Sequence, residues 1–246
     1  MSTISPLLNY IPKDICQQNL FLTKYPEFDG RGIKIAVIDG AVDLSLEGLQ
    51  KTSDGRPKII DCFDFSGAGD VDTSVIKEMD AENYLIGLSG RKLKIPTKWK
   101  NPSKKWHLGL KSLYKPLTKL NEKLPKFDCI VWFNGTKWVA CINTLKGDLE
   151  NAKVLGNFRD ENEYDILTFS HLELSYCITI DDGGNLLQIF TSYCEHSSYV
   201  TQVAAAYFSD NSDQNGLAPG AQIVSMNVMH PEKSIIYSAL KEAVSF

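Results

Sequence analysis

Residues 33–40 read IKIAVIDG, and this stretch decides the class of fold that we expect. Residues 33–38 are rich in β-branched side chains and alternate little between apolar and polar positions. That pattern is typical of a strand buried on both faces of a parallel sheet. Asp39 and Gly40 end the run at the carboxyl edge, where open α/β sheets gather functional side chains. From this segment alone, Asp39 is equally compatible with an ordinary turn or helix-capping residue.

Two more strands and two helices are expected later in the chain. Residues 58–65, KIIDCFDF, and residues 223–228, IVSMNV, both read as strands. Residues 197–208 carry apolar and small side chains at helical spacing, which indicates a tightly packed helix. Residues 234–246 predict an amphipathic helix with Ser234 as its N-cap. These elements indicate an α/β domain.

The middle of the chain reads as a separate α+β unit. Asn134-Gly135 lies between two strand-like runs and predicts a hairpin with a type I′ turn. A second hairpin is expected around the polar residues 181–185, and residues 147–158 resemble a short helix. We therefore divide the chain into residues 1–74, an insert at 75–190, and a continuation of the first domain at 191–246.

The charge distribution disfavours a nucleic-acid-binding role for the whole chain. The formal net charge is -4, yet residues 91–126 hold twelve basic side chains and one acid, Glu122. This basic run is either a patch for an anionic partner or a solvated, lysine-rich surface. The second interpretation is the commoner one for charge runs of this kind.

The six cysteines form no CxxC pair and no Cys/His cluster with zinc spacing. Six scattered cysteines in a chain of 246 residues do not make a disulfide scaffold, so we expect reduced thiols and a cytoplasmic location. We predict no metal site and no cofactor. The first fourteen residues lack the pattern of a secretory signal, and no stretch approaches the ~20 apolar residues that span a bilayer, so no membrane role is expected.

A hydroxyl nucleophile needs a base, and the base needs a partner that holds its tautomer. Four histidines are present, and His196 alone opens the small-residue helix. A histidine at a helix start is more often a surface or packing residue than a catalytic base. The residues by themselves thus indicate an α/β domain with a candidate Asp39–His196 pair.

Three segments, in the right order, resemble the landmarks of subtilases. Residues 35–43, IAVIDGAVD, resemble the strand and D-[ST]-G-[VI]-[DN] motif around the subtilase aspartate. Residues 196–200, HSSYV, lie where these peptidases have H-G-T-H-V, and residues 215–221, NGLAPGA, match the next landmark. The long separation of Asp39 and His196 narrows the resemblance to the tripeptidyl-peptidase II family. So do four further segments: residues 25–31, 54–58, 66–72 and 87–91.

The resemblance implies a subtilisin-like parallel sheet flanked by helices, incomplete here, with the α+β insert between its Asp and His motifs. It implies that Asp39 orients the base and that His196 acts as general base and then acid. Glu232 is the candidate for holding the free N-terminus of a substrate. The implied function is removal of tripeptides from the N-termini of oligopeptides.

Two departures from the family pattern carry expectations of their own. The nucleophilic serine motif and the oxyanion asparagine are expected further along than Phe246, so we predict no peptidase activity for these residues alone. The Asp and His motifs are also altered, and the Cβ of Ser197 is expected to displace the imidazole. The alternative function is an inactive pseudopeptidase that binds peptides or a full-length relative. An exposed sheet edge predicts self-association.

Overall fold

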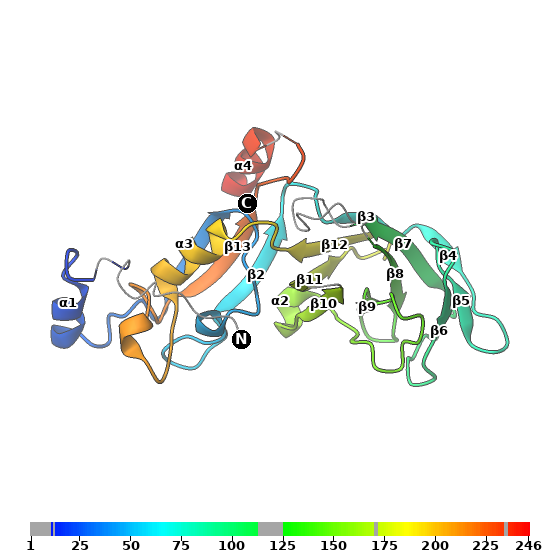
Figure 1. Ribbon diagram of the computed structural model, residues 1–246, viewed down its shortest axis with the longest axis horizontal. Helices are drawn as coiled ribbons and strands as arrows, with labels where there is room; N and C mark the ends of the chain where they lie inside the picture. The colour runs from blue at the N-terminus through cyan, green and yellow to red at the C-terminus, as the bar shows by residue number, and fades with distance from the viewer. Residues whose placement is uncertain (1–10, 12, 113–124, 170–171, 234–235) are drawn as a thin grey trace.

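The computed structural model describes residues 11, 13–112, 125–169, 172–233 and 236–246. The chain forms two lobes side by side (Figure 1). One is an α/β lobe around a parallel sheet, and the other consists almost entirely of antiparallel strands. In the described residues, no helix is both long and apolar enough to cross a membrane.

The α/β lobe has a three-stranded parallel sheet in the order β1-β13-β2. Its strands are β1 (Lys34–Asp39), β2 (Ile59–Asp64) and β13 (Gln222–Asn227). All three lie where the sequence predicts strands, because each has a compact run of β-branched and aromatic side chains. The last strand in the sequence occupies the centre of the sheet, so both earlier strands hydrogen-bond to it.

Two helices pack on opposite faces of this sheet. The helix α3 (His196–Ala205) buries Ala205 in a core with Val37 and Ile223. The helix α4 (Ile236–Ser245) packs through Ala239 and Ala243 on the other face, against β13 residues such as Met226. Both helices are predicted by the sequence, although Ser234, the expected cap of α4, lies outside the described residues. The remaining helical segments of this lobe are α1 (Gln18–Lys24), η2 (Glu47–Leu49) and η4 (Ser212–Gln214).

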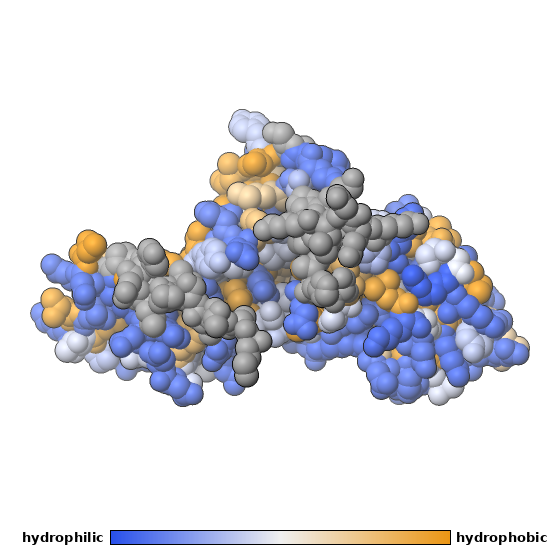
Figure 2. Space-filling model, viewed as in Figure 1, coloured by the Kyte–Doolittle hydropathy of each residue, from blue (hydrophilic) through white to orange (hydrophobic). Residues whose placement is uncertain are grey.

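The expected burial of β1 on both faces is wrong. Val37 points into the core beneath α3, whereas Ala36 and Ile38 on the opposite face are exposed. The cause is that β1 is an edge strand, and α4 packs against β13 and β2 rather than over β1. Figure 2 shows further hydrophobic side chains around α4 at the top of the view.

The second lobe is a sandwich of two four-stranded antiparallel sheets. One has the order β10-β11-β12-β3 and the other β4-β7-β8-β9. Their inner faces share a core that includes Tyr176, Leu187, Phe127 and Val131. The strands are β3 (Asp70–Asp72), β4 (Val75–Lys77), β7 (Trp106–Ser112), β8 (Lys126–Phe133), β9 (Trp138–Cys141), β10 (Asp165–Phe169), β11 (Leu172–Ile180) and β12 (Leu186–Thr191). The sandwich therefore takes in residues 70–72 as well as strands from the predicted insert.

A small hairpin of β5 (Tyr84–Ile86) and β6 (Lys92–Lys94) covers the outer face of the second sheet. Leu85 and Leu93 pack there with Trp106 and Trp132. The expected amphipathic stretch near 108–124 is in part the strand β7, and residues 113–124 lie outside the described residues.

Two local expectations within the insert are wrong. Residues 147–157 contain no helix, and the short helix α2 (Phe158–Glu161) begins at Phe158, where the predicted helix ends. The hairpin of β8 and β9 is present, but only Gly135 has a positive φ, +105°, so its turn is not type I′. Instead, the Asn134 side chain accepts hydrogen bonds from the backbone N–H groups of Thr136 and Lys137.

Candidate active site

Asp39 lies at the carboxyl end of β1, buried beneath the first turn of α3. Its Oδ1 accepts a hydrogen bond from the Gly40 N–H at 2.6 Å, and its carbonyl accepts one from Val228 N–H at 2.8 Å. The second oxygen, Oδ2, is 2.6 Å from Nδ1 of His196. Two contacts thus hold the carboxylate and one holds the backbone of Asp39 at the sheet edge, with one carboxylate oxygen directed at the imidazole.

His196 is the first residue of α3, and 67 % of its side chain is exposed. Only Nδ1 faces Asp39; among the described residues, none forms a hydrogen bond with Nε2. A carboxylate at Nδ1 holds the proton there and leaves the Nε2 lone pair available to accept one. The arrangement can therefore act as a general base toward a group that approaches from solvent.

Two serines tie the start of α3 to the loop after Asp39. Ser197 is fully buried, and its Oγ donates to the carbonyl of Ala41 at 2.6 Å. Ser198 Oγ accepts a hydrogen bond from the Asp43 N–H at 2.9 Å. The side chain of Ser197 therefore does not hold the imidazole away from Asp39, contrary to the expectation from the altered motif.

Gly40 packs closely against Cys194, two residues before His196. A Cβ at position 40 would lie 3.1 Å from the Cys194 Sγ and 3.6 Å from the Ser197 Oγ. The subtilase pattern has Ser or Thr at this position, and here the neighbouring side chains occupy that space. The two altered motifs thus fit each other, which is a relation that neither motif reveals alone.

Sequence reasoning missed a polar row along the same sheet edge. In the strand register, Asp39 pairs with Asn227, and Asn227 pairs with Asp64. Asn227 Nδ2 donates to Asp64 Oδ1 at 2.9 Å, and Asp64 Oδ2 accepts from the Gly69 N–H. The signal was available, because each of these residues ends its strand. Their hydrogen bonds fix the edge and the loop that enters the sandwich.

Glu232 is exposed on the segment that follows β13. Its backbone N–H donates to Nδ1 of His230, but its side chain makes no contact with Asp39 or His196. The structure therefore brings Asp39 and His196 together and leaves Glu232 apart from them. His230 is buried, and desolvation followed by repulsion from Lys233 lowers the pKa of its imidazole. The described residues contain no group of three His, Cys, Asp or Glu side chains that could hold a metal ion.

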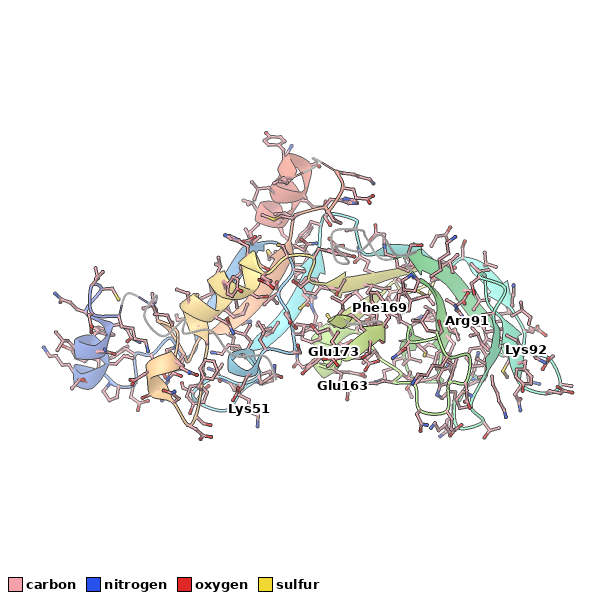
Figure 3. All side chains as sticks on the ribbon, viewed as in Figure 1. Lys51, Arg91, Lys92, Glu163, Phe169 and Glu173 are labelled. Atoms are coloured by element: carbon pink, nitrogen blue, oxygen red, sulfur yellow. The ribbon has the colours of Figure 1, made fainter. Side chains whose placement is uncertain are left out.

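The segment 87–91, GLSGR, has a structural role. Ser89 donates to the fully buried carboxylate of Asp128 through its N–H at 2.8 Å and its hydroxyl at 2.5 Å. Arg91 Nη1 adds an ion pair at 2.8 Å. Gly87 is required here, since a Cβ would lie 2.4 Å from the Asp128 carboxylate. Arg91 lies in the sandwich lobe, away from α3 (Figure 3).

No family model matches the chain. Tripeptidyl-peptidase 2 of Caenorhabditis elegans is 34 % identical over an alignment of 278 positions that covers 86 % of this chain. Tripeptidyl-peptidase 2 of Oryza sativa subsp. japonica is 32 % identical over an alignment of 294 positions that covers 90 % of this chain. The chain belongs to the tripeptidyl-peptidase 2 family. It spans about a fifth of the length of these relatives, 20 % and 22 % respectively.

A crystal structure of tripeptidyl peptidase 2 (TPP II) superimposes with a TM-score of 0.67 over 85 % of this chain and 21 % of that one. At 21 % identity this match speaks for the fold. It confirms the expected α/β class, a subtilisin-like parallel sheet with an insert. All eight strands of the β-sandwich lie between Asp39 and His196 in the sequence.

Proposed function

We propose that this chain carries the acid–base part of a serine tripeptidyl-peptidase that removes tripeptides from the N-termini of oligopeptides. The 2.6 Å contact between Asp39 Oδ2 and His196 Nδ1 is the observation that supports this proposal most directly. Membership of the tripeptidyl-peptidase 2 family supplies the substrate class. The hydroxyl nucleophile and the oxyanion donors come from outside the residues described here.

In this mechanism the Nδ1 proton of His196 stays on the hydrogen bond to Asp39. Nε2 takes the proton of a serine hydroxyl as that oxygen attacks the scissile carbonyl. The imidazolium then gives the proton to the departing amine, and Asp39 stabilises the positive charge while it exists. Because Nε2 faces solvent, a substrate and a nucleophile can both approach it.

Glu232 is our proposed anchor for the free N-terminus of the peptide. It follows β13 on the side of the sheet where β1 ends at Asp39. An exposed carboxylate there is suited to an ammonium group three residues from the cleaved bond. Loss of this anchor should raise KM for peptides with a free N-terminus and leave the rate on N-acetylated peptides unchanged.

A chimera tests the proposal. The segment of the Caenorhabditis elegans tripeptidyl-peptidase 2 that aligns with this chain is replaced by this chain. The product is assayed for release of a fluorescent amine from a tripeptide amide. We expect activity that His196→Ala lowers by roughly 10⁴-fold or more and that Asp39→Asn lowers by about 10⁴-fold.

Tyr199→Phe is the matched control, because Tyr199 lies on the same helix, is exposed and bonds only to Glu195. It should leave the rate within a factor of about two, as for a surface change of less than 0.5 kcal/mol. A chimera that is as active with His196→Ala as without it would refute the proposed role of the pair.

The second candidate is a peptide-binding pseudopeptidase, which the altered residues Gly40 and Ser197 favour. An inactive but folded chimera that still binds a peptide with a free N-terminus would support it. The free state of all six cysteines supports a reducing compartment such as the cytoplasm for either function.

Self-association is also part of the proposal. It is supported by the free edge of β1 and by the exposed side chains of Ile38, Tyr237 and Val244. Light scattering over a concentration series should show a mass that rises with concentration. A constant monomer mass would contradict it.

A further inference from the structure

The β-sandwich reaches directly into the loop that follows Asp39. Ser175 on β11 is buried, and its Oγ donates to Asp43 Oδ1 at 2.6 Å. The Ser175 Oγ also accepts a hydrogen bond from the Leu44 N–H at 2.9 Å. One side chain of the insert thus holds both a carboxylate and a backbone amide of the loop 40–45.

The loop passes this contact on to the helix that begins at His196. The Asp43 N–H donates to Ser198 Oγ at 2.9 Å, and Ser198 lies two residues after the histidine. Ser197 Oγ donates to the Ala41 carbonyl at 2.6 Å in the same loop. The loop is therefore bonded to β11 on one side and to the first turn of α3 on the other.

Packing at the same junction is independent of these hydrogen bonds. Cys177 of β11 and Phe190 of β12 lie in one core cluster with Val42 and Leu44 of the loop. The cluster also contains Ala205 of α3. Since a packed core moves as a unit, β11 and the loop are not free to shift separately.

We propose that Ser175 is a positioning residue, through which the β-sandwich sets the placement of His196 against Asp39. This inference rests on the function proposed above for the pair. Ser175 touches neither the imidazole nor the Asp39 carboxylate; it acts through Asp43 and Ser198. A displacement of ~1 Å at such a site can cost about 10²-fold in rate, so a hydrogen bond that fixes the loop matters for the pair.

The tautomer of His196 is the test, because the hydrogen bond at Nδ1 determines which ring nitrogen carries the proton. The chain is labelled with 15N-histidine, and the two ring nitrogens are observed by NMR at a pH where the imidazole is neutral. In the unmodified chain we expect the Nδ1–H tautomer. Ser175→Ala should lower the ratio of Nδ1–H to Nε2–H by about fivefold, because the shifted loop weakens the Asp39–His196 hydrogen bond by about the free energy of one ordinary hydrogen bond.

Three further single variants and one double variant make the outcome specific. Ser175→Thr keeps the hydroxyl and should restore the ratio. Ser198→Ala removes the hydrogen bond between Asp43 and α3, so it should lower the tautomer ratio as much as Ser175→Ala does. In the Ser175→Ala/Ser198→Ala double variant, the free-energy change should be smaller than the sum of the two single changes. Thr144→Val is the matched control, since its buried hydroxyl donates to the Asp128 carbonyl at 2.8 Å within the sandwich, remote from the loop.

The outcomes separate the two proposals. If the unmodified chain itself lacks the Nδ1–H tautomer, the pair does not form and the proposed function loses its support. If the tautomer is present and Ser175→Ala leaves the ratio unchanged, only the positioning role is refuted. An equal fall with Thr144→Val would also refute it, since any loss of sandwich stability would then suffice. If the Ser175→Ala variant does not fold, the tautomer ratio of His196 in Ser198→Ala is the test instead, and an unchanged ratio refutes the positioning role.

Discussion

Raising the pH from 7 to 10 should stabilise this chain relative to its Lys58→Met variant. Lys58 is fully buried, and its Nζ donates to the carbonyls of Pro219 and Ala221 at 2.6 and 2.9 Å. Burial lowers the pKa of its ammonium from 10.5 to about 8, against the attraction of the carboxylates of Asp29 and Asp54. At a pH between about 8 and 10.5, Lys58 has lost its proton in the folded chain but still holds it in the unfolded chain. The free energy of unfolding therefore rises with pH in this range.

The size of the effect follows from the pKa change. A fall from 10.5 to about 8 corresponds to about 3 kcal/mol in full, and because pH 10 is still below the pKa of 10.5 in the unfolded chain, the expected gain up to pH 10 is about 2 kcal/mol. Asp29 and Asp54 stay ionised over this range. Burial opposes the ionisation of Asp29, but hydrogen bonds from Arg31 and Ser53 together leave the pKa of its carboxyl lowered, and the Thr52 hydroxyl lowers the pKa of Asp54.

The assay is urea unfolding of both proteins at several pH values with a thiol reductant present. The buried thiols of Cys129 and Cys141 act in the opposite direction. Burial raises their pKa in the folded chain, so these thiols ionise at a lower pH in the unfolded chain, and the free energy of unfolding falls as the pH rises. This contribution is the same in both proteins. The difference between the two free energies isolates Lys58. A difference that stays flat from pH 7 to 10, or that moves against the unmodified chain, would refute the reasoning.

Three other predictions concern the sandwich, the first turn of α3 and the thiols. Arg91→Ala should lower the free energy of unfolding by about 3 kcal/mol, because it leaves the Asp128 carboxylate buried without its charged partner; a loss below 1 kcal/mol in urea titration would contradict this. Ser197→Gly, which restores the family residue, should destabilise the chain by about 1–2 kcal/mol through a lost hydrogen bond and added backbone freedom, as a shift in thermal midpoint would show. Cys16 and Cys194 are exposed and should react within minutes with a colorimetric disulfide reagent in the folded chain. The other four cysteines are buried, and rapid reaction of any of them would contradict the structure: Cys62, Cys129, Cys141 and Cys177.

The strands of the parallel sheet could be predicted because their signals are local. Residues 33–38, 58–65 and 223–228 carry compact apolar runs, and each forms a strand whose two ends lie within one residue of the expected ends. The candidate pair Asp39 and His196 followed from a strand end, a helix start and the family motifs. The exposure of Ala36 did not follow, because the sequence does not state which strand lies at the edge.

The contacts between distant segments could not be predicted from the sequence. Ser175 and Asp43 are 132 positions apart, and neither stands in a motif that names the other. The close fit of Gly40 with Cys194 is of the same kind. The helix expected at 147–158 had a local sequence pattern. In the structure, however, Leu155 of this segment forms a bridge with Ala140 of β9, so tertiary contacts outweighed helix propensity.

The position of β13 in the middle of the parallel sheet constrains the order of events during synthesis. Neither β1 nor β2 has a partner in the sheet until residues 222–227 leave the ribosome. At about 5–20 residues per second, β1 waits roughly ten to forty seconds for that strand. All strands of the sandwich are available earlier, so the insert can form its own core while the two halves of the surrounding lobe are still apart. A nascent chain paused before residue 222 should therefore protect the sandwich from proteolysis and leave the segment around Asp39 open to it.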